Sequence, residues 1–211
     1  MNRKAEATEV QRRLAKEYPG AKISLEFSNP LELLVATILS AQCTDGMVNK
    51  VTASLFAKYR TAKDYANADL GQFEQEIRST GFYRNKARNI IGAAGLMIAD
   101  FGAQVPRTMA ELITLPGVAR KTANVVLYNG YGVTYGIAVD THVKRLSGRL
   151  GLTPNSNPAK IEKDLMKQVP KDKWGYFSNL MIEHGRAVCQ ARKPKCNTCL
   201  LSDFCPSAFK V

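Results

Sequence analysis

Four cysteines lie close together near the carboxyl end of the sequence: Cys189, Cys196, Cys199 and Cys205, in the pattern C-x6-C-x2-C-x5-C. A disulfide framework is not expected in a chain of this size without an export signal. The four thiolates therefore predict a metal site, with zinc or an iron–sulfur cluster as the candidates. Only the central pair has the short spacing of structural zinc sites, so the uneven gaps favour a cluster and leave zinc open. The fifth cysteine, Cys43, is interpreted as a small buried apolar side chain.

A second chemical signal is the short turn LPGVARKTA, at residues 115–123. Helical patterns precede and follow it, so it predicts a helix-hairpin-helix. The free backbone N–H groups of such a turn, together with the start of the next helix, can bind a DNA phosphate. Gly117 would allow a close backbone approach there. An ordinary helical hairpin is the alternative interpretation of this turn.

The charge of the chain also indicates a polyanionic partner. Its 211 residues include 30 Lys and Arg but only 18 Asp and Glu, which gives a net charge of +12. Small soluble domains commonly carry a net charge of magnitude about 2–8. An excess beyond that range favours nucleic acid, because lysine and arginine neutralise phosphates and release counterions.

The elements that must position these groups are predicted to be helices. No stretch alternates with period two, and apolar residues recur at helical spacing along most of the sequence. The segment LELLVATILSAQ, at 31–42, is apolar nearly all round and predicts a buried central helix. Asp69, Thr108 and Asp140 are suited to cap the starts of later helices. The predicted fold class is all-α.

Several motifs occur in a specific order. They are LLVATILSAQCTD at 33–45, TGFYRNKARNII at 80–91, LPGVARKTANVVL at 115–127, VDTHVKRL at 139–146, and the four cysteines. Together they resemble the endonuclease III family of base-excision DNA glycosylases, over about residues 25 to 205. The resemblance implies that the cysteines hold a [4Fe–4S] cluster.

The resemblance also implies a two-domain helix-hairpin-helix DNA glycosylase fold. A six-helix barrel domain is expected over 24–134, with the hairpin at about 108–130. A discontinuous helical domain is expected to combine 1–23 with 135–211 and to carry the cluster loop at 189–205.

The catalytic residues that the resemblance implies are Lys121 and Asp140. A lysine amine can displace a damaged base from C1′ of its sugar and remain attached as a Schiff base. The Schiff base acidifies C2′, so β-elimination can then cut the strand. A carboxylate can stabilise the positive charge that develops on the sugar and help to free the amine of its proton. The amine must be neutral to attack, and we expect desolvation and neighbouring positive charges to favour that state.

Further residues are expected to contact DNA. Gln42 and Phe82 match the positions with which the family fills the base stack after a nucleotide is extruded, although most members carry leucine at the second. Asp45 either lines the pocket or caps the helix expected from Gly46. His142 is a candidate phosphate or pocket contact.

The hairpin turn departs from the family at one position. It supplies Gly117, Ala119 and Arg120 as DNA contacts, but the family usually has glycine where this chain has Ala119. If that position required a positive φ or a very close approach, alanine would cost about 1 kcal/mol. We therefore expect weaker or slightly shifted phosphate binding.

The function predicted from these residues is that of a bifunctional DNA glycosylase and apurinic/apyrimidinic lyase for oxidised pyrimidines. Its partner would be double-stranded DNA with damaged pyrimidines or abasic sites, bound by a monomer. One alternative is a monofunctional mismatch glycosylase of the same fold, which Lys121 argues against. Another is a non-catalytic DNA-binding module that holds zinc. MNRKAEATEV does not resemble a targeting peptide, so we expect a cytoplasmic, nucleoid-associated and prokaryotic protein with no membrane partner.

Overall fold

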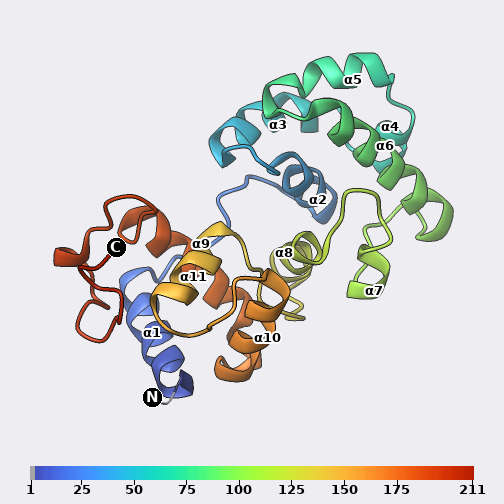
Figure 1. Cartoon of the computed structure of the whole chain (residues 1–211). Helices are drawn as coiled ribbons and strands as arrows, with labels where there is room; N and C mark the ends of the chain where they lie inside the picture. Colours follow the sequence, from blue (N-terminus) through green and yellow to red (C-terminus); the bar gives the residue numbers. More distant parts are fainter. Residues whose placement is uncertain (1–2) are drawn as a thin grey trace. The chain divides into compact units, whose positions relative to one another are not determined.

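The computed structural model of the chain describes residues 3–211, and in this part all regular elements are helices (Figure 1). The prediction of an all-α fold is confirmed. The chain divides into two compact units. One is continuous, Ser24–Val133, and the other combines residues up to Ile23 with Thr134–Val211. We refer to them as the continuous unit and the discontinuous unit.

The continuous unit is built around a buried helix. Its elements are α2 (Pro30–Leu39), α3 (Asp45–Lys58), α4 (Ala62–Ala66), α5 (Leu70–Glu76), the 3-10 turn η1 (Arg78–Thr80), α6 (Tyr83–Asp100), α7 (Met109–Leu112) and α8 (Arg120–Tyr131). Asn29 starts α2, because its side chain accepts a hydrogen bond from the Glu32 N–H and Pro30 follows it. Seven consecutive residues of α2, 33–39, are buried, and the helix packs against α8, α3 and α6. This agrees with the expected buried central helix.

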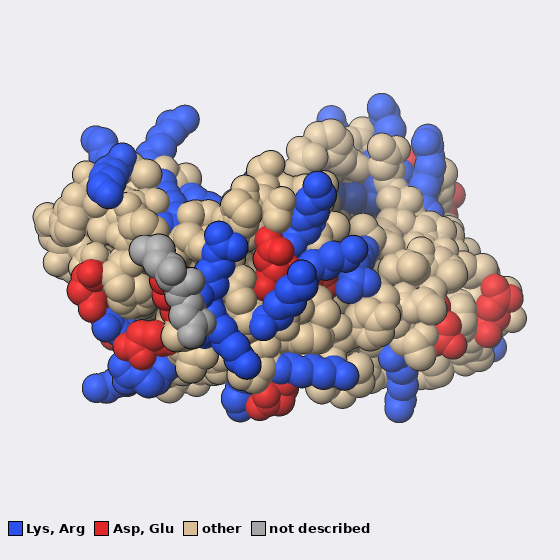
Figure 2. All heavy atoms as spheres, turned by 60° about the horizontal axis from the view of Figure 1, so that its bottom comes forward, with Lys and Arg blue, Asp and Glu red and all other residues tan. Residues whose placement is uncertain are grey.

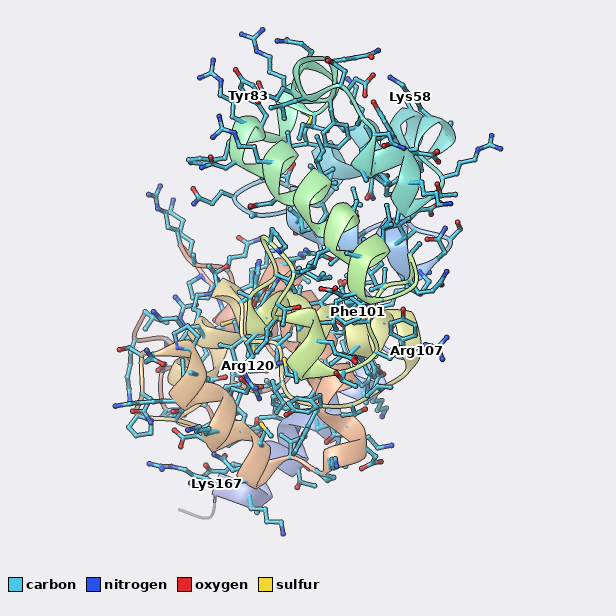
Figure 3. All side chains as sticks on the ribbon, turned by 90° about the vertical axis from the view of Figure 1, so that its right-hand side faces the viewer. Lys58, Tyr83, Phe101, Arg107, Arg120 and Lys167 are labelled. Carbon is cyan, nitrogen blue, oxygen red and sulfur yellow. The ribbon has the colours of Figure 1, made fainter. Side chains whose placement is uncertain are left out.

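The longest helix of the continuous unit is α6. Figure 3 marks its first residue, Tyr83, and the residue that ends it, Phe101. It packs against α4 and α5, and its inner face buries Ala87, Ile90 and Ala94.

The discontinuous unit brings distant parts of the sequence into one core. Its elements are α1 (Arg3–Glu17), α9 (Thr141–Arg149), α10 (Pro158–Gln168), the 3-10 turn η2 (Lys171–Lys173), α11 (Trp174–Ala187) and the 3-10 turn η3 (Cys196–Thr198). Helix α1 packs against α10 and α11, and α9 packs against α11. Fully buried Val10 and Leu14 of α1 join Phe177 and Leu180 of α11 in the core.

The expected helix starts agree with the structure, because they are set by local hydrogen bonds. The side chains of Asp69, Thr108 and Asp140 each accept a backbone N–H in the first turn of the helix that follows. The short helix α4 was not predicted. It begins with a reciprocal capping box between Thr61 and Asp64, a signal that the sequence does contain.

No helix within residues 3–211 is long and apolar enough to cross a membrane. Figure 2 shows one face of the molecule, from which lysine and arginine side chains project in many places and acidic side chains in fewer. This distribution agrees with the net charge of +12.

Candidate functional site

The hairpin turn between α7 and α8 depends on one glycine. Gly117 has a φ of +77°, a backbone conformation that L side chains rarely adopt. A Cβ added to it would lie 2.9 Å from Cβ and 3.0 Å from Nδ2 of Asn89, which belongs to α6. Gly117 is therefore required both for the turn and for the close approach of the turn to α6.

Ala119 occupies the N-cap position of α8 without strain. Its φ and ψ are −88° and 168°, an extended conformation that alanine adopts readily. The positive φ of the turn is at Gly117, so the structure gives no reason to expect weaker phosphate binding from Ala119. No side chain caps α8, and the N–H groups of its first turn can bind an anion. Arg120, labelled in Figure 3, is exposed in this turn and adds a positive charge.

Lys121 is the second residue of α8 and its side chain is exposed. The protein alone does not desolvate this amine, contrary to the expectation that burial would favour its neutral form.

Asp140 lies in the discontinuous unit as the N-cap of α9. Its Oδ1 accepts a hydrogen bond of 2.8 Å from the N–H of Val143, and the residue is half-buried. The carboxylate is thus held in a fixed orientation by the helix that it starts.

The two residues expected to fill the base stack share an unusual backbone conformation. Gln42 has a φ of +54° and Phe82 a φ of +48°, although neither is glycine. Both are exposed, and Phe82 is 62% accessible despite its apolar ring. Strained residues of this kind are concentrated at functional sites. Asp45 lies in the first turn of α3, and Thr44 caps that helix, so the alternative in which Asp45 is the cap is wrong.

Cys43 differs from its interpretation as a buried residue, because it is only half-buried. It follows Gln42 directly, in the irregular segment between α2 and α3, where the chain cannot cover it fully.

His142 lies within the protein packing. Its Nδ1 is 3.2 Å from Arg145 Nη2, which must be the donor, and burial lowers the pKa of His142. A Cβ on Gly185 of α11 would lie 2.7 Å from the same nitrogen. The imidazole is thus neutral and fixes the contact of α9 with α11.

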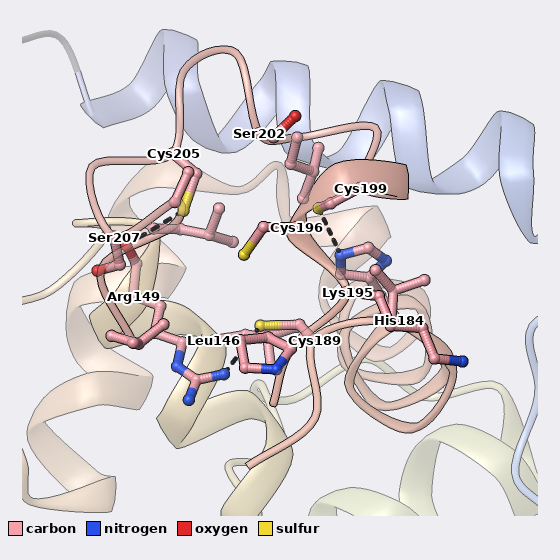
Figure 4. A pocket seen from close by; sticks show the side chains of 16 residues that line it. Leu146, Arg149, His184, Cys189, Lys195, Cys196, Cys199, Ser202, Cys205 and Ser207 are labelled. Atoms are coloured by element: carbon pink, nitrogen blue, oxygen red, sulfur yellow. Dashed lines mark hydrogen bonds between the residues drawn. The ribbon is translucent and has the colours of Figure 1, made fainter. Parts of the chain in front are cut away.

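The four C-terminal cysteines line one pocket, and Figure 4 shows their sulfur atoms facing a shared space. Within residues 3–211, no three His, Cys, Asp or Glu side chains lie close enough together to hold a single metal ion. Four sulfurs around one zinc would lie about 3.8 Å apart. The donor set of four thiols around a space therefore fits a cuboidal cluster better than one zinc ion.

Two groups that the sequence did not reveal lie beside the cysteine sulfurs. Arg149 Nη1 donates a hydrogen bond of 3.3 Å to Cys189 Sγ, and His184 Nε2 lies 3.4 Å from Cys199 Sγ (Figure 4). Burial lowers the pKa of His184 to about 4, so the ring is neutral. Tyr18 Oη lies 3.2 Å from Nδ1. In the tautomer that carries its proton on Nε2, the ring donates to the sulfur of Cys199. Such bonds orient metal ligands and tune the group they hold.

A second set of hydrogen bonds connects α9 to the start of the cysteine loop. Arg145 donates through Nε and Nη2 to the carbonyl of Cys189, at 3.1 and 2.9 Å. One turn later, Arg149 donates to the carbonyls of Gln190 and Ala191, at 2.7 and 3.0 Å. The helix that begins at Asp140 therefore also holds the first cysteine of the pocket.

Helix α1 holds the other end of the loop. Arg13 donates to both carboxylate oxygens of Asp203, at 2.7 and 2.9 Å, and to the carbonyl of Leu200 at 2.7 Å. Its guanidinium lies over the ring of Phe204, 4.9 Å from the centroid. A bidentate pair of this geometry fixes the orientation of both partners.

The uncapped helix after a glycine turn and the four-cysteine pocket define a helix-hairpin-helix protein with a site suited to an iron–sulfur cluster. Residues 35–171 match the model of the HhH-GPD superfamily of base excision DNA repair proteins, and residues 189–205 match the iron-sulfur binding domain of endonuclease III. The chain is 56% identical to endonuclease III of Synechocystis sp., over 98% of this chain and 94% of that protein. It is 47% identical to endonuclease III of Bacillus subtilis, over 92% of this chain and 88% of that protein.

A solved structure of a trapped endonuclease III–DNA covalent intermediate is also similar. It has a TM-score of 0.94 and 47% identity, and the match covers 97% of this chain and 96% of that one. The chain belongs to the endonuclease III family. It is thus a DNA-binding base-excision enzyme, a DNA glycosylase and apurinic/apyrimidinic lyase, and its cofactor is a [4Fe–4S] cluster. The prediction of the family, the enzyme class and the cofactor is confirmed.

Proposed function

We propose that the chain removes oxidised pyrimidines from double-stranded DNA as a monomer, with Lys121 as its nucleophile and Asp140 as the stabiliser of the cationic sugar. The observation that carries the proposal is the position of Lys121. It is exposed on the first turn of an uncapped helix, directly after a turn whose backbone N–H groups can bind a phosphate.

The chemistry of this lysine proceeds in two steps. In the first, the Nζ lone pair forms a bond to C1′ while the bond from C1′ to the base breaks, and the base leaves with that electron pair and is protonated. The attached nitrogen then passes a proton to O4′ as its lone pair forms the C=N bond. The C1′–O4′ bond breaks, the sugar ring opens, and a protonated Schiff base remains. In the second step, loss of a C2′ proton expels the 3′ phosphate and cuts the strand. Water finally hydrolyses the Schiff base and releases the enzyme.

Asp140 acts on the first of these steps. Positive charge develops on the sugar as the base departs, and a fixed carboxylate stabilises that charge. Its hydrogen bond to the N–H of Val143 limits its rotation, so little reorganisation is needed during the reaction.

The cluster contributes to this function through the loop that it holds. When bound, the [4Fe–4S] group supplies four iron–thiolate bonds, for which Cys189, Cys196, Cys199 and Cys205 are the proposed ligands. The protein surroundings disfavour the thiolate form of these ligands, because burial raises the pKa of the Cys199 and Cys205 thiols.

Borohydride trapping tests the proposed activity. Duplexes that carry thymine glycol, an abasic site, or adenine opposite 8-oxoguanine are incubated with the protein and reduced. We expect a covalent adduct with the first two duplexes and none with the third. An adduct with adenine opposite 8-oxoguanine alone would assign a different substrate. Light scattering of the eluting protein tests the monomer.

A further inference from the structure

Lys86 is a buried lysine in α6, only 4% accessible. Its Nζ donates two hydrogen bonds of 2.7 Å, one to the carbonyl of Leu39 and one to the carbonyl of Thr80. Lysine is almost never fully buried without a specific partner, because an ammonium loses its hydration there. Burial accordingly lowers the pKa of Lys86. A residue that is costly to bury and bound at two places indicates a role beyond filling space.

The two carbonyls lie at the ends of helical elements. Leu39 is the last residue of α2, and Thr80 is the last residue of η1. Carbonyls in the last turn of a helix lack partners within the helix, and the negative end of its dipole attracts a cation. The Lys86 ammonium therefore satisfies two groups that the backbone leaves unbonded, and it connects two segments that are far apart in the sequence.

Those two segments carry the residues expected to enter the base stack. Gln42 follows Leu39 by three residues, and Phe82 follows Thr80 by two. The backbone N–H of Lys86 also donates to the carbonyl of Phe82, at 3.1 Å. Lys86 thus holds Phe82 through its main-chain N–H. Through its side chain it also holds the two segments that precede Gln42 and Phe82.

Both exposed residues need such support. A positive φ at a residue other than glycine costs on the order of 1 kcal/mol and persists only where the surroundings impose it. Gln42 and Phe82 both have this conformation, and both side chains are too exposed to hold the backbone in it by their own packing. The backbone before each of them must therefore be held, and Lys86 holds both.

We propose that Lys86 is a positioning residue that fixes the distance between the Gln42 and Phe82 segments, so that both can enter the stack when a nucleotide is extruded from a duplex. This inference rests on the proposed function. A displacement of about 1 Å at such a site reduces the rate by about a hundredfold. The loss falls only on substrates whose nucleotide must leave a stack, because Lys121 chemistry at an unstacked sugar does not need these residues.

The test compares duplex and single-stranded substrates in one set of variants. Lys86→Met keeps a linear side chain without donors, and Lys86→Arg keeps a cation with donors in different positions. The control is Arg88→Gln, which removes one positive charge from an exposed position of the same helix. Single-turnover cleavage is measured at an abasic site in a duplex and in a single strand, and the fold of each variant is checked by circular dichroism.

We expect Lys86→Met to slow duplex cleavage at least about tenfold and to change single-strand cleavage less than about twofold. Arg88→Gln leaves the ratio of the two rates as in the unchanged protein. Equal losses on both substrates, or no loss on the duplex, would overturn the proposal. If Lys86→Met does not fold, Lys86→Arg decides by the same ratio: a selective duplex loss supports the proposal, and an unchanged ratio overturns it.

Extrusion itself is measured without chemistry. Each Lys86 variant is combined with Lys121→Gln and bound at saturation to a duplex with 2-aminopurine next to a thymine glycol, where its fluorescence rises when the neighbouring base leaves the stack. We expect a smaller rise with Lys86→Met than with Arg88→Gln, and an equal rise would contradict the inference. Because this measurement does not depend on cleavage, a failure of the lyase assignment would remain distinguishable from a failure of the Lys86 assignment.

Discussion

At the scale of single residues, Lys121 and Asp140 differ in how firmly the protein holds their side chains. Lys121 is exposed, while Asp140 is fixed by its own helix. In the proposed reaction, the lysine side chain can therefore follow the sugar, while the carboxylate is a charge of fixed position. Substitutions at the two positions are expected to fail in different ways.

Replacement of Lys121 with Gln removes the proposed nucleophile and keeps a polar side chain. Base release and strand cleavage are expected to fall to background, and borohydride should trap nothing, while DNA binding persists through the other basic residues. Asp140→Asn retains the capping oxygen, so α9 remains intact. Base release should then fall more than elimination at a preformed abasic site, which starts from an aldehyde. A trapped adduct at the normal rate with Lys121→Gln would show that another amine is the nucleophile.

Ala119→Gly tests whether the alanine in the hairpin turn weakens phosphate binding. Alanine and glycine can both adopt the extended backbone found at position 119, and the substitution changes no charge. We expect the same affinity for an abasic-site analogue and the same slope of log K against log salt concentration. Tighter binding by the glycine variant, measured by fluorescence anisotropy, would show that the Cβ of Ala119 hinders the phosphate.

At the scale of elements, the discontinuous unit depends on the contact of α9 with α11. The contact is close because Gly185 presents no side chain to His142 and Arg145, while Arg145 Nη2 donates to the Gly185 carbonyl at 2.9 Å. The same helix α9 carries Asp140 at one end and holds the cysteine loop at the other. The position of α9 therefore matters both to the carboxylate that we propose as catalytic and to the cysteine loop.

Gly185→Ala introduces a Cβ 2.7 Å from His142 Nδ1 and 3.1 Å from His142 Cβ. Because the second atom cannot rotate away, α9 or α11 must shift, and overpacking of this kind costs about 1–3 kcal/mol. Urea unfolding should show a lower midpoint. Gly148→Ala in α9 is the control, since nothing lies within 4 Å of its added Cβ and stability should be equal or slightly higher. Equal stability of the two variants would refute the packing argument.

Arg13→Gln removes the bidentate contact of α1 with Asp203 and the bond to Leu200. The loop should open more often, so a chelator should bleach the cluster absorbance faster than in the unchanged protein. Arg12→Gln provides a matched control, because Arg12 also pairs with Glu9 but, in the part of the chain that the structure describes, bonds to no residue of the cysteine loop. Identical bleaching rates for both variants would mean that α1 does not retain the loop.

At the scale of the whole molecule, the cysteine loop is where the two ends of the discontinuous unit meet. Arg13 and Leu200 are 187 residues apart in the sequence, and Arg145 and Cys189 are 44 apart. The loop has only one 3-10 turn of its own, η3. Its conformation is therefore held by these distant arginines, and we expect bonds from the four cysteines to the cluster to hold it further.

The purified protein should be yellow-brown and bind about four irons per chain. Cys199→Ser should bleach it, because one of the four thiolates is lost. Cys43→Ser should keep its colour, since Cys43 lies in the continuous unit and outside the pocket. Elemental analysis of anaerobically prepared protein is the measurement, and zinc with negligible iron and sulfide would contradict the cluster.

The features that could be predicted from the sequence are those with local causes. Asp69, Thr108 and Asp140 mark the starts of their helices, because each side chain accepts a hydrogen bond from the N–H three residues later. The cysteine spacing likewise indicated a metal site without any knowledge of the fold, and it favoured a cluster while leaving zinc open. These signals located the candidate site along the chain but not the groups that surround it.

The remaining features arise from contacts between distant residues. Neither His184 nor Arg149 has a sequence pattern that identifies it as a neighbour of a cysteine sulfur. Lys86 was part of a recognised segment, yet its burial depends on carbonyls 47 and 6 residues away. The left-handed backbone of Gln42 and Phe82 could not be expected either, because residues other than glycine adopt it only under tertiary constraint.

The division of the chain has a consequence for the order of events during synthesis. Residues 24–133 form a continuous unit that can complete its own contacts while translation proceeds. Helix α1 is made before that unit, yet the partners of its buried Ala7, Val10 and Leu14 are made after it. The nascent chain must therefore carry an exposed apolar stripe on α1 until α10 and α11 emerge, and this interval is when the protein most needs a chaperone.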